Sequence, residues 1–205
     1  MWINGGLKLD SDDIPFTIYG DQLDYVNNFK YLGLWIEPNL KFDKHLNILQ
    51  NKIKKQINVI SRCRRYLTTS QSIYLFKALV LPIFDYVDVY YSSANKDDLD
   101  QLQILQNRCL RACYSRNKWP GTIKAHTENG LMFLEDRRTL HLAEIGLKHS
   151  SEKNRLKKFA YNSRNKDKLL LKEIRSKYRV IDKSIINIIP KIWNNLPDFI
   201  KKVTM

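Results

Sequence analysis

The acidic residues that could hold catalytic metal ions occur in pairs along the chain. Nucleotidyl transfer by two metal ions needs carboxylates held a few ångströms apart, so that the ions clamp the attacking and leaving oxygens. Asp12 and Asp13 lie in a polar stretch without a flanking strand, and Asp97 and Asp98 lie where a helix start favours acidic side chains. Neither pair is typical of a metal site, so the sequence predicts no metal ligands there.

A third pair, Asp85 and Asp88, has a different setting. These residues are three positions apart in an apolar, aromatic stretch, the kind of environment that perturbs a carboxyl group for catalysis. Acidic side chains in such a setting are more often paired with a cation than catalytic. We therefore predict that Asp85 and Asp88 pair with Arg or Lys from another helix.

Cysteine and histidine residues give no zinc motif. Cys109 and Cys113 are four residues apart, with His126 further on, and this spacing fits no standard finger or knuckle. Both thiols would lie on the apolar face of a helix, so we predict that they are core residues. The sequence also has no His-Glu-x-x-His arrangement, no Gly-rich phosphate loop and no Gly-x-Ser-x-Gly elbow. It predicts neither catalytic residues nor a metal or other cofactor in this chain.

Positive charge is the strongest functional indication. The chain has 35 Lys and Arg against 21 Asp and Glu, a net charge of +14 over 205 residues. Residues 1–45 carry −3, residues 46–115 carry +5 and residues 116–205 carry +12. Such asymmetry favours a polyanionic partner, most often nucleic acid, although a basic surface can also serve solubility alone.

Composition indicates an ordinary globular protein. With 43% hydrophobic residues, three cysteines and no apolar window of membrane-spanning length, we expect an intracellular protein without a membrane partner. The N-terminus lacks the basic start and apolar stretch of a secretory leader. Nucleus and cytoplasm remain equally open.

Strands are expected only near the N-terminus. Residues 15–19 are rich in strand formers, a turn is predicted at residues 20–22, and residues 23–26 would return as the second strand of a hairpin. A third strand is predicted over residues 29–36, in which Gly33 would mark a bulge or a close approach by another part of the chain.

An amphipathic helix is predicted from Asp43, which we take as its N-cap. Its apolar stripe recurs at helical spacing and comprises Leu46, Leu49, Ile53, Ile57 and Ile60. A basic flank lies outside that stripe, made of Lys52, Lys55 and Arg62. Arg64 and Arg65 follow near the helix end, where cations also complement the helix dipole.

Further helices are predicted downstream. One starts at Ser70 and is kinked or ended by Pro82, with residues 84–91 continuing as a helix or an extended run. Another starts at Asp97, with Leu99, Leu102, Gln106, Cys109 and Cys113 on one face and Arg108 and Arg111 beside it. An amphipathic stretch is expected over 131–147, a weakly ordered basic arm over 148–183, and short helices over 185–203.

Several motifs resemble one family in order and spacing. Phe29-Lys30-Tyr31-Leu32-Gly33, followed by residues 39–46, resembles the F-K-Y-L-G segment at the end of the reverse transcriptase domain of non-LTR (LINE-type) retrotransposons. Residues 78–86 resemble the family's A-x-x-x-P-x-x-x-Y helix, and residues 102–111 its L-Q-x-x-Q-N-R-x-L-R helix. Looser likenesses are Asp136-Arg137-Arg138 and the Trp-Asn-Asn-Leu-Pro at 193–197.

The resemblance implies the C-terminal part of such a polymerase. It assigns residues 1–42 to a β-hairpin remnant of the palm, 43–115 to a thumb-like helical domain, 116–147 to a linker with an amphipathic helix, and 148–205 to a basic C-terminal extension. The hairpin would be the primer grip, with primer-grip-like residues Phe29, Lys30, Tyr31, Leu32 and Gly33. The thumb would contact RNA, an RNA–DNA hybrid or duplex DNA through Lys52, Lys55, Arg62, Arg64, Arg65, Arg108 and Arg111.

Departures from the family pattern bear on activity. The family's Tyr-x-Asp-Asp motif is missing from this chain, as is its Cys/His knuckle, so we expect no polymerisation by the chain alone and Mg²⁺ only with a palm domain. The sequence thus predicts a mainly α fold with a small N-terminal β-hairpin that binds nucleic acid. The alternatives are a protein-interaction or assembly module, a decayed copy without function, and an enzyme completed in trans by a separate palm domain. A palm or endonuclease region of the full-length element is the expected protein partner.

Overall fold

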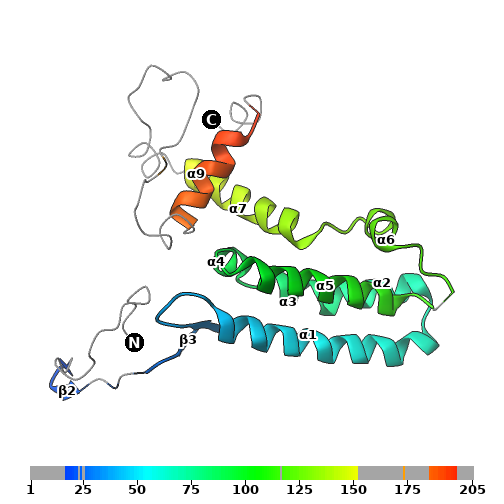
Figure 1. Cartoon of the computed structure of the whole chain (residues 1–205), viewed down its shortest axis with the longest axis horizontal. Helices are drawn as coiled ribbons and strands as arrows, with labels where there is room; N and C mark the ends of the chain where they lie inside the picture. The colour runs from blue at the N-terminus through cyan, green and yellow to red at the C-terminus, as the bar shows by residue number, and fades with distance from the viewer. Residues whose placement is uncertain are drawn as a thin grey trace. The chain divides into compact units, whose positions relative to one another are not determined.

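The computed structural model describes residues 17–22, 24, 26–115, 117–151, 173 and 185–197 (Figure 1). It is mostly helical with two small antiparallel strand pairs near the N-terminus, so the predicted fold class is confirmed. The chain divides into two compact units. Unit 1 comprises Met1–Val87 and Ala94–Trp119, and unit 2 comprises Asp88–Ser93 and Pro120–Met205. None of the helices in the described ranges is both long and apolar enough to cross a bilayer.

Two hairpins form the β part of unit 1. Strand β1 (Thr17–Ile18) pairs with β2 (Asp21–Gln22), and β3 (Phe29–Tyr31) pairs with β4 (Leu34–Ile36). The turn predicted at residues 20–22 was therefore misplaced, since Asp21 and Gln22 are strand residues.

The predicted single strand over residues 29–36 was also wrong. Leu32 and Gly33 have φ angles of 44° and 89°, and two successive positive φ angles make the two-residue turn that suits the twist of a hairpin. Gly33 thus closes a turn between β3 and β4 rather than forming a bulge.

Helix α1 (Asp43–Cys63) buries the predicted stripe. All five apolar side chains are buried, namely Leu46, Leu49, Ile53, Ile57 and Ile60. The N-cap is Phe42, in the left-handed region and without a side-chain cap, so Asp43 is a first-turn acid and not the predicted N-cap. The carboxylate of Glu37 accepts a hydrogen bond from the Lys44 backbone N–H at 3.2 Å and satisfies a donor of the first turn from outside the helix.

The other helices of unit 1 follow recognisable start and stop signals. Helix α2 (Thr69–Leu79) begins with a capping box in which Thr68 and Gln71 bond reciprocally, and it ends three residues before Pro82. The remaining elements are η1 (Arg64–Tyr66), α3 (Leu81–Asp85) and α5 (Lys96–Cys113). Pro82 therefore lies in the first turn of α3, where its missing N–H has no intrahelical partner to lose.

Helices α1, α2 and α5 pack around one core. The chain runs along α1, returns along α2 and runs forward again along α5, so α1 and α5 are parallel (Figure 1). The core side chains of α5 are Leu102, Leu105, Gln106, Cys109, Leu110 and Cys113, whereas Leu99 of the predicted face is only half-buried. Because α1 and α5 run the same way, their C-terminal ends lie together.

Two helices supply most of the core of unit 2. The unit contains α4 (Asp88–Tyr91), α6 (Thr122–Glu128), α7 (Leu134–Ser151) and α9 (Ile185–Asn195), of which α6 was not predicted. Leu142 of α7 and Ile189 of α9 share a core with Val89. Gly146 lets the helices approach, since a Cβ there would lie 3.0 Å from Ile189 Cγ2. The predicted basic arm over 148–183 lies outside the described residues except at its start and at Glu173.

Candidate nucleic-acid interface

A basic pocket lies where the C-terminal ends of α1 and α5 meet. Its volume is about 360 Å³, and its polar and aromatic lining includes Asn58, Ser61, Arg64, Arg108, Arg111 and Trp119. No acidic side chain lines it within the described part of the chain. Three of the seven basic residues predicted to bind nucleic acid are thus brought together, although they come from positions up to 47 residues apart.

Arg64 holds the two helix ends together. It is the C-cap of α1, it is half-buried, and its guanidinium Nη1 donates a hydrogen bond to the Tyr114 carbonyl at 2.5 Å. Tyr114 is the C-cap of α5, so this bond satisfies one of the carbonyls that a helix end leaves without an intrahelical partner. Arg64 therefore has a structural role in addition to its position at the pocket.

Arg108 and Arg111 supply the accessible charge. Both are exposed and are three residues apart on α5, so they lie one turn above the other. The C-termini of α1 and α5 each contribute roughly −0.5 charge at this place. Three guanidinium groups exceed that by about two positive charges, so the pocket attracts anions even after the helix ends are counted.

The other predicted basic residues lie elsewhere on unit 1. Lys52, Lys55 and Arg62 are exposed on α1, and at about 100° per residue they lie roughly 40° to 120° around the helix from Asn58 of the pocket. Arg65 is exposed in η1. The structure therefore forms two adjoining basic surfaces, the pocket and an α1 flank of Lys52, Lys55 and Arg62.

Cations on both surfaces keep their charge available. Within the described residues, no acidic side chain forms an ion pair with any of the seven predicted basic residues. Among these residues, neither Arg108 nor Arg111 supplies the cation predicted to pair with Asp85 or Asp88.

Two residues beside the pocket were missed by sequence reasoning. Lys54 is exposed four residues before Asn58, so it continues the pocket's side of α1. Its spacing of four residues from Asn58 and seven from Ser61 could have placed Lys54 on this side of the helix from the sequence alone. Trp119 lies in the stretch assigned to a linker with an amphipathic helix, residues 116–147, and nothing in the local sequence shows that its ring lies against Tyr114 at the end of α5.

The β3–β4 hairpin is fixed to the helices by Tyr86. The Tyr86 hydroxyl donates a hydrogen bond to the Leu32 carbonyl in the hairpin turn. A Cβ on Gly33 would lie 2.9 Å from the Tyr86 hydroxyl oxygen and 3.2 Å from its Cε1, so the ring would have to shift if this position carried a side chain. The predicted close approach at Gly33 is confirmed, and its partner is an aromatic side chain.

The predicted primer-grip-like residues are all exposed on that hairpin. Phe29, Tyr31 and Leu32 have exposed fractions of 49%, 59% and 76%, and Lys30 and Gly33 are exposed as well. Behind them, Lys44 of α1 places its Nζ 3.8 Å from the centroid of the Trp35 ring on β4. The hairpin is thus held from two sides while its outer residues face solvent.

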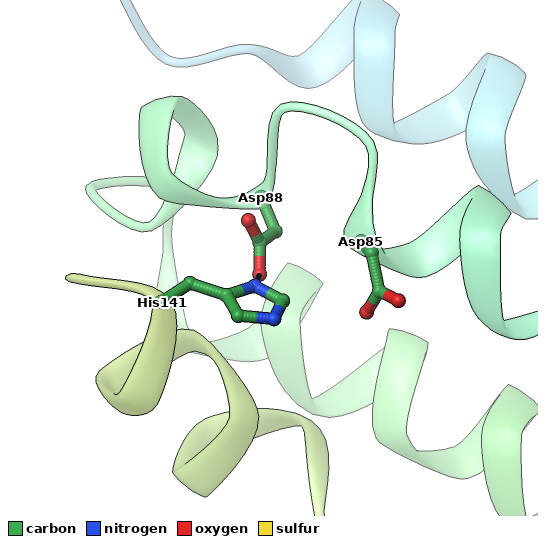
Figure 2. Close-up of side chains that lie close together, drawn as sticks. All are labelled: Asp85, Asp88 and His141. Atoms are coloured by element: carbon green, nitrogen blue, oxygen red, sulfur yellow. Dashed lines mark hydrogen bonds and ion pairs between the residues drawn. The ribbon is translucent and has the colours of Figure 1, made fainter. Parts of the chain in front are cut away.

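Asp88 of unit 2 has a histidine partner. His141 Nδ1 lies 2.6 Å from Asp88 Oδ2, and this contact joins α4 to α7 (Figure 2). The prediction that Asp88 pairs with Arg or Lys of another helix did not include this histidine. It named the right kind of contact, because a buried carboxylate needs a donor and an imidazole N–H supplies one.

The cysteines lie in the core, as predicted. Cys109 and Cys113 are fully buried on α5, and burial raises the pKa of each thiol to about 12. His126 is buried in α6, stacked on Phe133 with ring centroids 4.3 Å apart, and burial lowers its pKa. These groups are packed into the interiors of their units.

Comparison with known proteins connects the chain to a polymerase. A segment of 98 residues, 46% of this chain, is 29% identical to the RNA-directed DNA polymerase from mobile element jockey of Drosophila funebris. The chain contains a region related to reverse transcriptases. That segment covers 11% of the jockey polymerase, so the chain spans only a small part of its relative's length. No family model and no solved structure matches the chain.

Proposed function

We propose that this reverse transcriptase-related chain is a thumb-like module that binds RNA or an RNA–DNA duplex through the basic surfaces of unit 1. The observation that carries the proposal is the set of cations on α1, η1 and α5 that no described acidic side chain neutralises. If these cations formed ion pairs within the fold, their positions would be accounted for without a ligand. Their absence within the described residues favours an external polyanion.

Phosphate contacts account for both basic surfaces. Lys52, Lys55 and Arg62 are long, exposed and spread along about three turns of α1, an arrangement that can follow a nucleic-acid backbone. Such contacts position a duplex without reading its sequence. We therefore expect affinity that depends strongly on salt and weakly on base sequence.

The hairpin gives the module a second contact point. Its turn is held by Tyr86 and its base by Lys44 and Glu37, so β3 presents Phe29 and Tyr31 from a fixed backbone. This arrangement suits the primer-grip-like role that the sequence resemblance implies. Polymerisation would require catalytic carboxylates and Mg²⁺ held by a palm domain, which we propose as the partner that supplies them.

A binding titration with matched variants tests the proposal. Labelled RNA–DNA hybrid, RNA duplex and DNA duplex are titrated with the chain at low and moderate salt. Arg111→Ala should weaken binding of all sequences of one nucleic-acid type about equally, because it removes a phosphate contact. Lys96→Ala removes the same charge from the opposite end of α5 and is the control. Equal effects of the two variants would show that only net charge matters, and no binding at low salt would refute the proposal.

Exposed apolar residues favour a second candidate function, a protein-interaction module. Phe29, Tyr31 and Leu32 form an uncovered apolar group on the hairpin, and such groups often mark contact sites. A palm domain is the partner that this position suggests. Phe29→Ser with Tyr31→Ser should abolish association with a separately produced palm domain while leaving hybrid binding by the α1 flank in place. Loss of hybrid binding alone would assign the hairpin to nucleic acid instead.

A further inference from the structure

The pocket between α1 and α5 has an aromatic side as well as a cationic one. Trp119 is half-buried and lines the pocket, and its ring meets Tyr114 edge to face with centroids 5.3 Å apart at an interplanar angle of 81°. Tyr114 is buried and is also the residue whose carbonyl Arg64 holds. The indole therefore lies against a buried aromatic ring and lines the same pocket as the three guanidinium groups.

A regular duplex can contact only the cationic side of this pocket. The outer surface of a duplex offers phosphates and sugars, which the arginines can bind, but its bases are stacked on one another and cannot reach an indole. An unpaired nucleotide offers both parts, a phosphate for guanidinium groups and a free base face for an aromatic ring. The pocket volume of about 360 Å³ lies within the range of sites that bury small ligands.

We infer that this pocket binds one unpaired nucleotide of a strand whose paired part lies on unit 1. Arg108 and Arg111 bind its phosphate, and Trp119 stacks on its base. The exposed side chains of Asn58 and Ser61 border the same space and offer hydrogen bonds to the sugar. This inference rests on the proposed function, and it adds a site for a single-stranded end to a surface for a duplex.

The ligand is identified by chemistry and not by base. Stacking on an indole tolerates every base, because each has a π-face. No acidic side chain lines the pocket in the described residues, so discrimination by a carboxylate is not expected. The site should therefore accept a tail of any sequence, on RNA or DNA.

Two forms of one substrate separate this inference from the proposed function. A short RNA–DNA hybrid is prepared with blunt ends and with a single-stranded tail, and each form is titrated with the whole chain. The tailed form should bind about fivefold or more tightly, the effect of one base–aromatic stack. Equal binding of the two forms would overturn the pocket assignment and leave duplex binding standing. No binding of either form would overturn the proposed function itself.

Variants locate the effect. Trp119→Ala should remove most of the advantage of the tail and weaken tailed hybrid far more than blunt hybrid. Tyr66→Ala truncates another exposed aromatic residue, in η1 and outside the pocket lining, and should leave the advantage intact. If both variants or neither reduce the advantage, the assignment of Trp119 is wrong.

Tryptophan fluorescence tests the assignment without Trp119→Ala, a variant that could unfold. Trp119→Phe keeps an aromatic ring in the pocket, and circular dichroism verifies its helix content. Binding of a tailed hybrid should quench tryptophan emission more than binding of a blunt one in the wild-type chain, and Trp119→Phe should abolish that difference. A difference that persists would place the stacking at another tryptophan and overturn the proposal. Free uridine monophosphate carries the same phosphate and base as an unpaired nucleotide of a strand. If it competes with the tailed hybrid at a concentration similar to that of the tail, the pocket is assigned to free nucleotides instead.

Discussion

Replacement of Gly33 by alanine tests how the hairpin is fixed to the helices. Gly33 has a φ of 89°, a conformation that costs an L-residue about 1 to 2 kcal/mol. The new Cβ would lie 2.9 Å from the Tyr86 hydroxyl oxygen, so the ring must move away from the turn. Its hydrogen bond to the Leu32 carbonyl is then lost, at a net cost of about 0.5 to 1.5 kcal/mol. Gly33→Ala should therefore lower the free energy of unfolding of unit 1 by about 1.5 to 3.5 kcal/mol.

Urea unfolding, followed by tryptophan emission and circular dichroism, measures that change. Gly20→Ala is the matched control, because Gly20 has a φ of 92° in the other hairpin turn and nothing within 4 Å of the added Cβ. It should show the backbone cost alone.

A double-mutant cycle isolates the Tyr86 contact. Tyr86→Phe removes the hydroxyl, so Gly33→Ala should cost about 0.5 to 1.5 kcal/mol less in that background than in the wild-type chain. Additive effects of the two substitutions would refute the conclusion that Tyr86 holds the hairpin turn.

Four other predictions concern the two units. Lys52→Ala with Arg62→Ala should flatten the slope of log Kobs against log salt by about 1 to 2 units, measured by anisotropy titration, and an unchanged slope would exclude phosphate contacts on this flank. In unit 2, Asp88→Asn should lower the free energy of unfolding by about 1 to 3 kcal/mol, because it weakens a charge-assisted hydrogen bond to His141. Urea melts measure this change, and an unchanged midpoint would mean that the contact between Asp88 and His141 is not formed. Burial holds the pKa of His126 below its ordinary 6.5, so near this pH the unfolded state binds more protons than the folded state. The free energy of unfolding should therefore fall as the pH drops through 6.5, and His126→Gln should reduce that dependence in thermal melts. Native protein should react with a thiol reagent at the half-exposed Cys63 only, and at all three cysteines after denaturation, because Cys109 and Cys113 are buried. Mass spectrometry locates the modified residues, and modified Cys109 in the native protein would contradict its burial.

Helices were predictable where one periodicity dominated. The stripe from Leu46 to Ile60 recurs at helical spacing over four turns, and no other arrangement buries all five side chains. The α5 face was predicted for the same reason. Helix α6 was missed because only Ala125 and His126 of its seven residues are buried, which leaves too short a pattern to detect.

The β3–β4 hairpin shows where local reasoning fails. Its sequence is rich in strand formers throughout, so β propensity alone predicts one long strand. The turn depends on Leu32 taking a positive φ, which is costly for this residue, and the Tyr86 hydroxyl bonds to the Leu32 carbonyl from 54 residues away. That contact belongs to tertiary structure and has no local counterpart in the sequence.

The basic residues of the candidate interface could be named from the sequence, whereas their grouping could not. Exposure of Lys52, Lys55, Arg62, Arg108 and Arg111 follows from their positions beside the apolar stripes. Their division into an α1 flank and a pocket depends on α1 and α5 running parallel, which brings the two helix ends together. Trp119 joins the pocket only through the path of the chain after α5.

Salt dependence of binding to an RNA–DNA hybrid tests the central claim most directly. If unit 1 binds the phosphate backbone through unneutralised cations, affinity should be high at low salt and fall steeply, with a slope of log Kobs against log salt near −0.9 for each phosphate contacted. The seven predicted basic residues set an upper bound of about −6 for their joint contribution. A clear negative slope that becomes shallower in Arg108→Ala with Arg111→Ala is the predicted result. Weak binding with a flat slope would contradict the account.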